Sequence, residues 1–120
     1  MERMRQRADF LAAASGLKVH AGAFVLQARR RDDEGPARVG FTVSKKVGNA
    51  VERNRVRRRL REMVRLLPLP LTSGHDYVLV GRRAALTLPF ARMAEEFEGA
   101  LKRVQKRRAG PSQDRNDYRQ

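Results

Sequence analysis

The chain contains no cysteine and no tryptophan, and it has only two histidines. Without cysteine, disulfide bonds and every thiolate-ligated zinc site are excluded. His20 and His75 are far apart in the sequence and have no neighbours at metal-ligand spacing, so we expect no histidine-based metal site. No serine lies in a recognisable nucleophile motif, and no glycine-rich phosphate loop is present. We therefore expect no catalytic residue in the polypeptide itself.

Long apolar runs and acidic residues are also scarce. No apolar stretch approaches the roughly 20 residues that a membrane-spanning helix needs, and the basic segment 1–7 leads into no signal-peptide core, so we expect a cytoplasmic protein. Asp and Glu together number 13 against 27 Lys and Arg, a net charge of +14. This excess indicates a polyanionic partner. Hydrophobic residues make up 41% of the chain, too many for a disordered basic tail.

The length of 120 residues is sufficient for one domain. We expect residues 1–108 to form it. From residue 109 onwards the chain is rich in Gly, Pro, Ser, Gln, Asp and Asn, which predicts a flexible polar tail over residues 109–120.

Residue periodicity predicts a mixed α/β domain. Alternating apolar residues predict strands at 24–29 and 38–44, and the polar turn 32–36 between them suggests a hairpin. Residues 77–80 read as a buried strand. Helices are predicted over residues 10–15, 51–67 and 88–104. The apolar stripe of the second helix comprises Val56, Leu60, Met63, Val64 and Leu67.

The segment 45–65 carries nine basic residues and only two acidic ones. On a helical wheel, one stripe about 100° wide lies opposite the apolar stripe; it contains Asn54, Arg57, Arg58, Arg61 and Arg65. A charged helix face is often merely solvated. Here, however, one sign dominates and Arg outnumbers Lys seven to two, which favours phosphate binding because guanidinium groups bind phosphate bidentately. A membrane-binding helix is less favoured, because the domain needs the apolar stripe for its core.

The stretch 38–61 reads RVGFTVSKKVGNAVERNRVRRRLR and closely resembles the signature of the bacterial ribonuclease P protein family. The matching motifs are a strand ending in Ser-Lys-Lys, a Gly-Asn-Ala turn and a helix beginning with Arg-Asn-Arg. The resemblance implies an α/β (α+β) fold in which a four-stranded sheet packs with three helices, similar to domain 2 of a small-subunit ribosomal protein. It also implies a left-handed βαβ crossover, an exception to the usual right-handed rule.

The same resemblance implies the function. A member of this family is the protein subunit of ribonuclease P and binds both the catalytic RNA and the 5′ leader of precursor tRNA. The RNA subunit would carry out the endonucleolytic removal of the leader, with Mg²⁺ held mainly by the RNA. No protein partner and no membrane would be required.

The resemblance also assigns two groups of site residues. The expected RNA-binding residues, including Arg65 from the basic stripe, are Lys45, Lys46, Asn49, Arg53, Asn54, Arg55, Arg57, Arg58, Arg61 and Arg65. The expected leader cleft comprises Phe10, Val25, Gln27, Thr42 and Ser44. Ala14 and Gln27 stand where family members often have aromatic residues, so we expect less base stacking in this cleft. From its sequence alone, Phe10 could equally be a core anchor of its helix.

Two other classes compete with this interpretation. A structural ribosomal protein or RNA chaperone would also need a basic helix, but it has no reason to carry the Gly-Asn-Ala turn before Arg-Asn-Arg. A DNA-binding protein would need Gln, Ser or Asn on a recognition helix to read base edges. This helix offers almost only Arg and a single Asn on its basic stripe.

Overall fold

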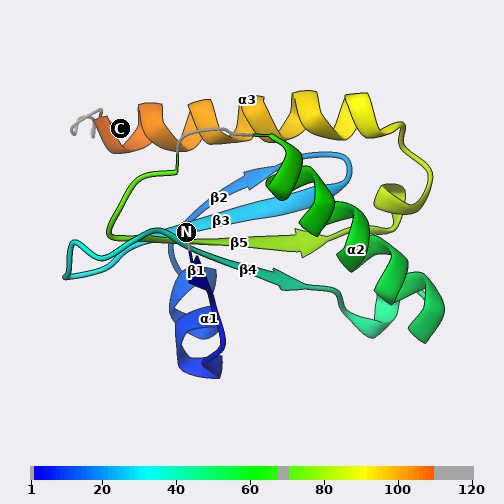
Figure 1. Ribbon diagram of the computed structural model, residues 1–120, viewed down its shortest axis with the longest axis horizontal. Coiled ribbons are helices and arrows are strands. Elements are labelled where there is room, and N and C mark those ends of the chain that lie inside the picture. The colour runs from blue at the N-terminus through cyan, green and yellow to red at the C-terminus, as the bar shows by residue number, and fades with distance from the viewer. Residues whose placement is uncertain (1, 68–70, 110–120) are drawn as a thin grey trace.

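A five-stranded mixed sheet organises the computed structural model, which describes residues 2–67 and 71–109. The strand order is β1-β4-β5-β3-β2. The strands are β1 (Glu2–Arg3), β2 (Leu17–His20), β3 (Phe24–Arg30), β4 (Arg38–Thr42) and β5 (His75–Gly81). The helices are α1 (Arg7–Ala14), α2 (Ala50–Leu66) and α3 (Phe90–Ala109), with short 3₁₀ turns η1 (Lys45–Val47) and η2 (Arg83–Leu86). Figure 1 shows α1 and α3 on opposite sides of the sheet.

The predicted α+β class and the three helices are confirmed, whereas the expected number of four strands is one too few. The additional edge strand β1 has only two residues, which pair in parallel with β4. Strand β2 was not predicted from periodicity either, because four residues give too short an alternation to stand out. The predicted tail lies outside the described residues from residue 110 onwards, and α3 includes Ala109.

The predicted hairpin between the strands expected at residues 24–29 and 38–44 is wrong. Strand β5 lies between β3 and β4 and pairs with both of them, antiparallel to β3 and parallel to β4. Six of its seven residues are buried. A strand that is apolar on both faces is stabilised most at the centre of a sheet, and this preference outweighs the short connection between β3 and β4.

Helix α2 connects the parallel strands β4 and β5, so the expected βαβ unit is present. Strand order and register do not fix the hand of this crossover, and the left-handed connection stays a prediction.

The main core lies between the sheet and the helices α2 and α3. The predicted stripe of α2 is buried at Val56, Leu60, Met63 and Val64, with Leu67 packed against its edge. From α3, the main core receives Met93, Phe97, Ala100, Leu101 and Val104. Phe24 and Phe97 meet edge to face with ring centroids 6.2 Å apart, an arrangement that aromatic pairs favour.

A smaller core lies on the other face of the sheet, beneath α1. Met4, Ala13 and Val78 are buried there, and Phe10 packs against them. The close approach of Phe10 requires Gly40, since a Cβ atom at that position would lie 2.5 Å from the ring atom Cε1. Gly40 therefore sets how closely α1 approaches β4.

Candidate RNA interface

The N-terminus of α2 is fixed by the motif that the sequence places before it. The Asn49 side chain accepts a hydrogen bond from the Glu52 amide at 2.8 Å, and the Glu52 carboxylate accepts one from the Asn49 amide at 3.0 Å. This reciprocal capping box satisfies two amides at the start of the helix. Arg53 donates to the Gly48 carbonyl at 2.8 Å. Two of the expected RNA-binding residues, Asn49 and Arg53, thus hold the turn and the helix together.

Two further arginines attach α2 to the segment that follows β5. Arg59 donates to the carbonyl of Ala85 and, at 2.6 Å, to that of Leu88. Arg83 donates to the Val47 carbonyl and pairs with Glu52 at 3.3 Å. Neither arginine was among the predicted site residues. The position of Arg59 at the flank of the wheel, between the apolar and basic stripes, is the signal that could have separated it from its neighbours.

The basic face of α2 comprises Asn54, Arg57, Arg58, Arg61 and Arg65, and it points away from the core as predicted. Arg57 donates to Asn54 at 2.9 Å, and Arg65 makes two 2.9 Å hydrogen bonds to Glu62. The Arg61 guanidinium lies 5.9 Å from the centroid of the Phe41 ring. These contacts orient three guanidinium groups at the surface of the helix.

Other cationic residues have no internal partner. Arg55, Arg58, Lys45 and Lys46 are exposed and make no ion pair or hydrogen bond through their side chains within residues 2–67 and 71–109. Their charge is therefore not offset by a carboxylate of the described chain. A row of unpaired cations on a rigid helix favours binding of a polyanion.

Two shallow hollows flank Arg58. The Phe90 hollow has a volume of about 550 Å³ and is lined by Val51, Arg55, Arg58, Arg59, Glu62 and Phe90. The Arg57 hollow has a volume of about 260 Å³ and is lined by Asn54, Arg57, Arg58 and Arg61. Arg58 stands on the ridge between them.

The expected leader cleft lies on the α1 face of the sheet. Strand register places Val25, Val80 and Thr42 in one row across the sheet, and all three are half-buried. The next row contains Gln27 and Gly40, on either side of Val78. The register thus places Val25, Gln27 and Thr42 on the same face of the sheet. Ser44 lies beyond the end of β4 and is exposed at the start of η1.

Phe10 lies at the edge of the smaller core, on the α1 face of the sheet. It is half-buried and packs on the α1-face core, as an anchor residue would. Its ring also lies over Gly40 in the second row of the cleft, and part of its surface is accessible. The structure brings Phe10 together with the β3 and β4 residues, whereas Ser44 lies apart from them.

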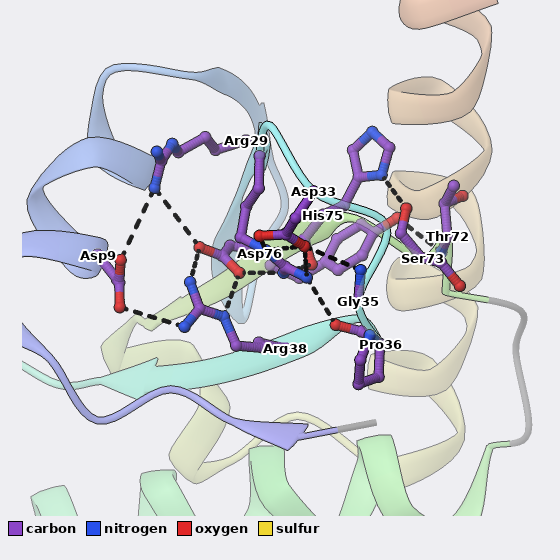
Figure 2. A network of polar contacts seen from close by, with 12 residues as sticks. Asp9, Arg29, Asp33, Gly35, Pro36, Arg38, Thr72, Ser73, His75 and Asp76 are labelled. Atoms are coloured by element: carbon purple, nitrogen blue, oxygen red, sulfur yellow. Dashed lines mark hydrogen bonds and ion pairs between the residues drawn. The ribbon is translucent and has the colours of Figure 1, made fainter.

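The third row across this face is charged and was not predicted. Arg29, Asp76 and Arg38 are neighbours on β3, β5 and β4. Figure 2 shows the guanidinium groups of Arg29 and Arg38 directed toward both Asp76 and Asp9 of α1. Asp76 is fully buried and accepts hydrogen bonds from Arg38 at 2.8 Å and from Arg31 at 2.7 Å.

The network continues into the loops at this end of the sheet. Arg31 also donates to the carbonyls of His75 and Pro36 and pairs with Asp33 at 3.0 Å. We call the six residues Asp9, Arg29, Arg31, Asp33, Arg38 and Asp76 the charge network. It contains three positive and three negative groups, so the cluster as a whole is neutral.

The charge network shifts the pKa values of Arg31, Asp33, Arg38 and Asp76. Burial alone would raise the pKa of Asp76, but the hydrogen bonds from Arg38 and Arg31 outweigh burial and hold that pKa below its ordinary value. The hydrogen bond to Asp76 raises the pKa of Arg38. The hydrogen bond from Arg31 lowers the pKa of Asp33. Asp76 is therefore ionised at neutral pH although it is inaccessible to solvent.

Two negative findings concern the described part of the chain. In residues 2–67 and 71–109, no group of three or more His, Cys, Asp and Glu residues is arranged to hold a metal ion. Within the same residues, no helix is both long and apolar enough to cross a membrane.

The fold and the charged surfaces define a class of small, basic α+β proteins in which one helix buries an apolar stripe and presents a cationic face. Two solved structures share this architecture. The ribonuclease P protein of Staphylococcus aureus aligns with a TM-score of 0.72 and 28% identity, covering 87% of this chain and 95% of that one. The ribonuclease P protein of Thermotoga maritima aligns with a TM-score of 0.71 and 30% identity, covering 86% of this chain and 97% of that one.

Sequence comparison gives the family. The model of the family described as Ribonuclease P matches residues 1–105. A ribonuclease P protein component from Gluconacetobacter diazotrophicus is 50% identical over 105 residues, 85% of this chain and 90% of the relative. A ribonuclease P protein component from Caulobacter vibrioides is 49% identical over 102 residues, which are 83% of this chain and 68% of the relative. The chain belongs to the ribonuclease P protein family.

Proposed function

We propose that this protein binds the catalytic RNA of ribonuclease P through the basic face of α2 and the adjoining residues Lys45, Lys46 and Arg55. The observation that carries the proposal is the set of cations on α2 and η1 that no carboxylate of the described chain neutralises. Bound phosphates would offset the repulsion between like charges on α2, such as Arg57 and Arg61, which lie one helical turn apart. Asn49 and Arg53 contribute by holding the start of α2 in place.

The α1 face of the sheet is proposed to receive the 5′ leader of precursor tRNA. Val25, Gln27 and Thr42 form a partly open surface beside Phe10, and Phe10 is the aromatic residue available there for stacking on a base. Ser44, exposed beyond β4, would contact RNA only where the leader leaves this surface.

In this proposal the RNA subunit performs the phosphodiester hydrolysis, and the protein positions the substrate. Mg²⁺ is held mainly by the RNA components and supplies the activated water when bound. The protein's cations reduce the repulsion between the two RNAs, so the holoenzyme needs less Mg²⁺ than the RNA alone. A cytoplasmic location agrees with this function, and no further protein partner is proposed.

The experiment that tests the proposal is cleavage of precursor tRNA at low Mg²⁺ by a cognate catalytic RNA, with and without the protein. We expect the protein to raise the cleavage rate and to have no activity alone. Cleavage by rigorously RNA-free protein would contradict the assignment of the chemistry to the RNA. An unchanged rate at every Mg²⁺ concentration would contradict the accessory role.

The proposed RNA specificity can be tested against the behaviour of a general RNA chaperone. Such a protein would bind structured RNAs without discrimination. A competition experiment with ribosomal RNA fragments of equal length distinguishes the two, because only the proposed function predicts preferential binding of the ribonuclease P RNA.

A further inference from the structure

The Phe90 hollow combines an aromatic ring with cationic residues. Phe90, the first residue of α3, is half-buried and packs against the main core with part of its surface. The rest of its side chain lines the hollow beside Val51, whose side chain is 76% exposed. Val51 and Phe90 give the lining of the hollow an apolar part that water solvates poorly.

The rim of this hollow is positively charged. Arg55 and Arg58 border it and have no internal partner within the described residues. Glu62, the acidic residue of the lining, is already bound by Arg65 through two hydrogen bonds. A hollow lined by both cationic and apolar side chains is complementary to a ligand with a flat ring and a negative group, which is the chemistry of a nucleotide.

The wall of the hollow is held rigidly. Arg59 joins α2 to the carbonyls of Ala85 and Leu88, immediately before α3 begins. The backbone leading into Phe90 is therefore held close to α2, which lowers the cost of ordering this wall when a ligand binds. The volume of about 550 Å³ lies within the usual range of small-ligand sites.

From these features we propose that the Phe90 hollow is a nucleobase subsite, in which one unstacked base of an RNA strand lies against Phe90. The neighbouring Arg57 hollow, which shares Arg58, receives the adjoining phosphate. The inference rests on the proposed binding of RNA by α2 and adds a non-electrostatic contact to it. Phe90 thereby becomes an RNA-binding residue outside the basic helix.

A tryptophan at this position provides a direct test, because the chain has none of its own. In Phe90→Trp protein, binding of the catalytic RNA is expected to quench the indole fluorescence through stacking. Long-chain inorganic polyphosphate, which offers charge but no base, is expected to bind without this quenching. Leu11→Trp is the matched control, since Leu11 is 59% exposed on α1, which packs on the opposite face of the sheet from α2.

Affinity measurements on unlabelled variants complete the test. Phe90→Leu keeps an apolar side chain but removes the ring, and thermal melts establish that the variant folds. We expect its affinity for the catalytic RNA to fall roughly ten-fold, while the slope of log affinity against log salt remains that of the unchanged protein. Stacking releases no counterions, so this pattern differs from the loss of an arginine contact.

Four results would overturn the inference. Equal quenching at residues 11 and 90, or quenching by polyphosphate, would show that the signal does not report a base. Tight, salt-dependent RNA binding with no quenching and no effect of Phe90→Leu would remove the subsite and leave the proposed function intact. A complete failure of the unaltered protein to bind the RNA would instead remove the proposed function together with the subsite.

Discussion

Asp76 and Arg38 lie side by side on neighbouring parallel strands and share two hydrogen bonds of 2.8 Å, one to each carboxylate oxygen. The carboxylate of this bidentate pair is buried, and Asp9 of α1 meets the same guanidinium at 3.3 Å. The pair therefore joins the sheet to the helix that carries Phe10. The proposed leader surface and the charge network share one face of the sheet and one helix.

Replacing Asp76 by Asn should destabilise the protein strongly. The change leaves Arg31 and Arg38 without their buried counter-charge, and breaking a buried ion pair costs about 3–5 kcal/mol. Asp9→Asn is the matched control, because Asp9 is more exposed and its ion pairs are 3.3 and 3.8 Å long; a loss below about 1 kcal/mol is expected. Urea titrations at pH 7 compare the two free energies of unfolding. Similar small losses in both variants would mean that the network contributes little to stability.

The same pair predicts how stability depends on pH. The pKa of Asp76 is depressed in the folded state. The stability that this carboxylate contributes is therefore fully present above about pH 3.9, the pKa of an aspartate in the unfolded chain, and it is lost as the pH falls below that value. The difference in unfolding free energy between wild type and Asp76→Asn should therefore narrow below about pH 4. Glu52 and Glu62 also have lowered pKa values, but they lie outside the charge network and titrate alike in both proteins, so their contributions cancel in the difference. A constant gap from pH 7 to pH 3 would contradict the assignment.

Removal of Arg58 and Arg61 together should weaken binding of the catalytic RNA without unfolding the protein. Both side chains are exposed on the basic face. In a plot of log affinity against log salt concentration, each lost phosphate contact should make the slope less steep by about 0.9 on duplex-like RNA. Arg92→Ala with Arg103→Ala removes the same charge from the exposed surface of α3 and serves as the control. Binding measured over a salt series separates the two double variants. Equal effects would point to net charge rather than to this helix face.

Phe10→Leu should reduce the affinity of the holoenzyme for precursor tRNA but not for mature tRNA. Leucine retains much of the packing over Gly40 but offers no ring for stacking, so the leader-dependent affinity should fall by on the order of 1 kcal/mol. Affinities of the holoenzyme for both RNAs, measured beside a thermal melt of the free protein, provide the check. An equal loss for the two RNAs would identify Phe10 as a core anchor only.

Asn49→Ala should act on RNA binding mainly through stability. Loss of the cap costs about 0.5–2 kcal/mol, and Asn49→Ser should restore most of it because serine can accept the same hydrogen bond. Melting temperatures test the cap. Catalytic-RNA affinities, corrected for unfolded protein, test the contact: a weakening shared by the Ala and Ser variants would show that Asn49 also touches the RNA directly.

Much of the α2 surface could be predicted from the sequence, because it depends on local geometry. The positions of Val56, Leu60 and Arg61 on a wheel follow from the helical repeat alone. The capping box could also be predicted from the sequence, since Asn49 and Glu52 stand at the characteristic spacing at the start of a helix. The capping role of Asn49 nevertheless escaped the prediction, because the resemblance suggested RNA contact for the same residue.

The charge network could not be predicted because it depends on strand order. Asp76 meets Arg38 and Arg31 from 38 and 45 residues away, and no local pattern links them. Because carboxylates ordinarily prefer water, an aspartate at the start of a strand is expected at the surface. Only after β5 is placed between β3 and β4 do Arg29 and Arg38 lie on either side of Asp76.

The central position of β5 also governs the order in which the chain can fold. β3 and β4 precede β5 in the chain but do not pair with each other, and the 17-residue helix α2 is completed before β5 begins. Until residues 75–81 are available, the two halves of the sheet have no common neighbour. The rate-limiting step should therefore be the insertion of a late strand through non-local contacts, which makes folding slower than in a helical bundle of equal size. A growing chain that ends before residue 75 carries the complete cationic helix without the strand on which the rest of the sheet assembles.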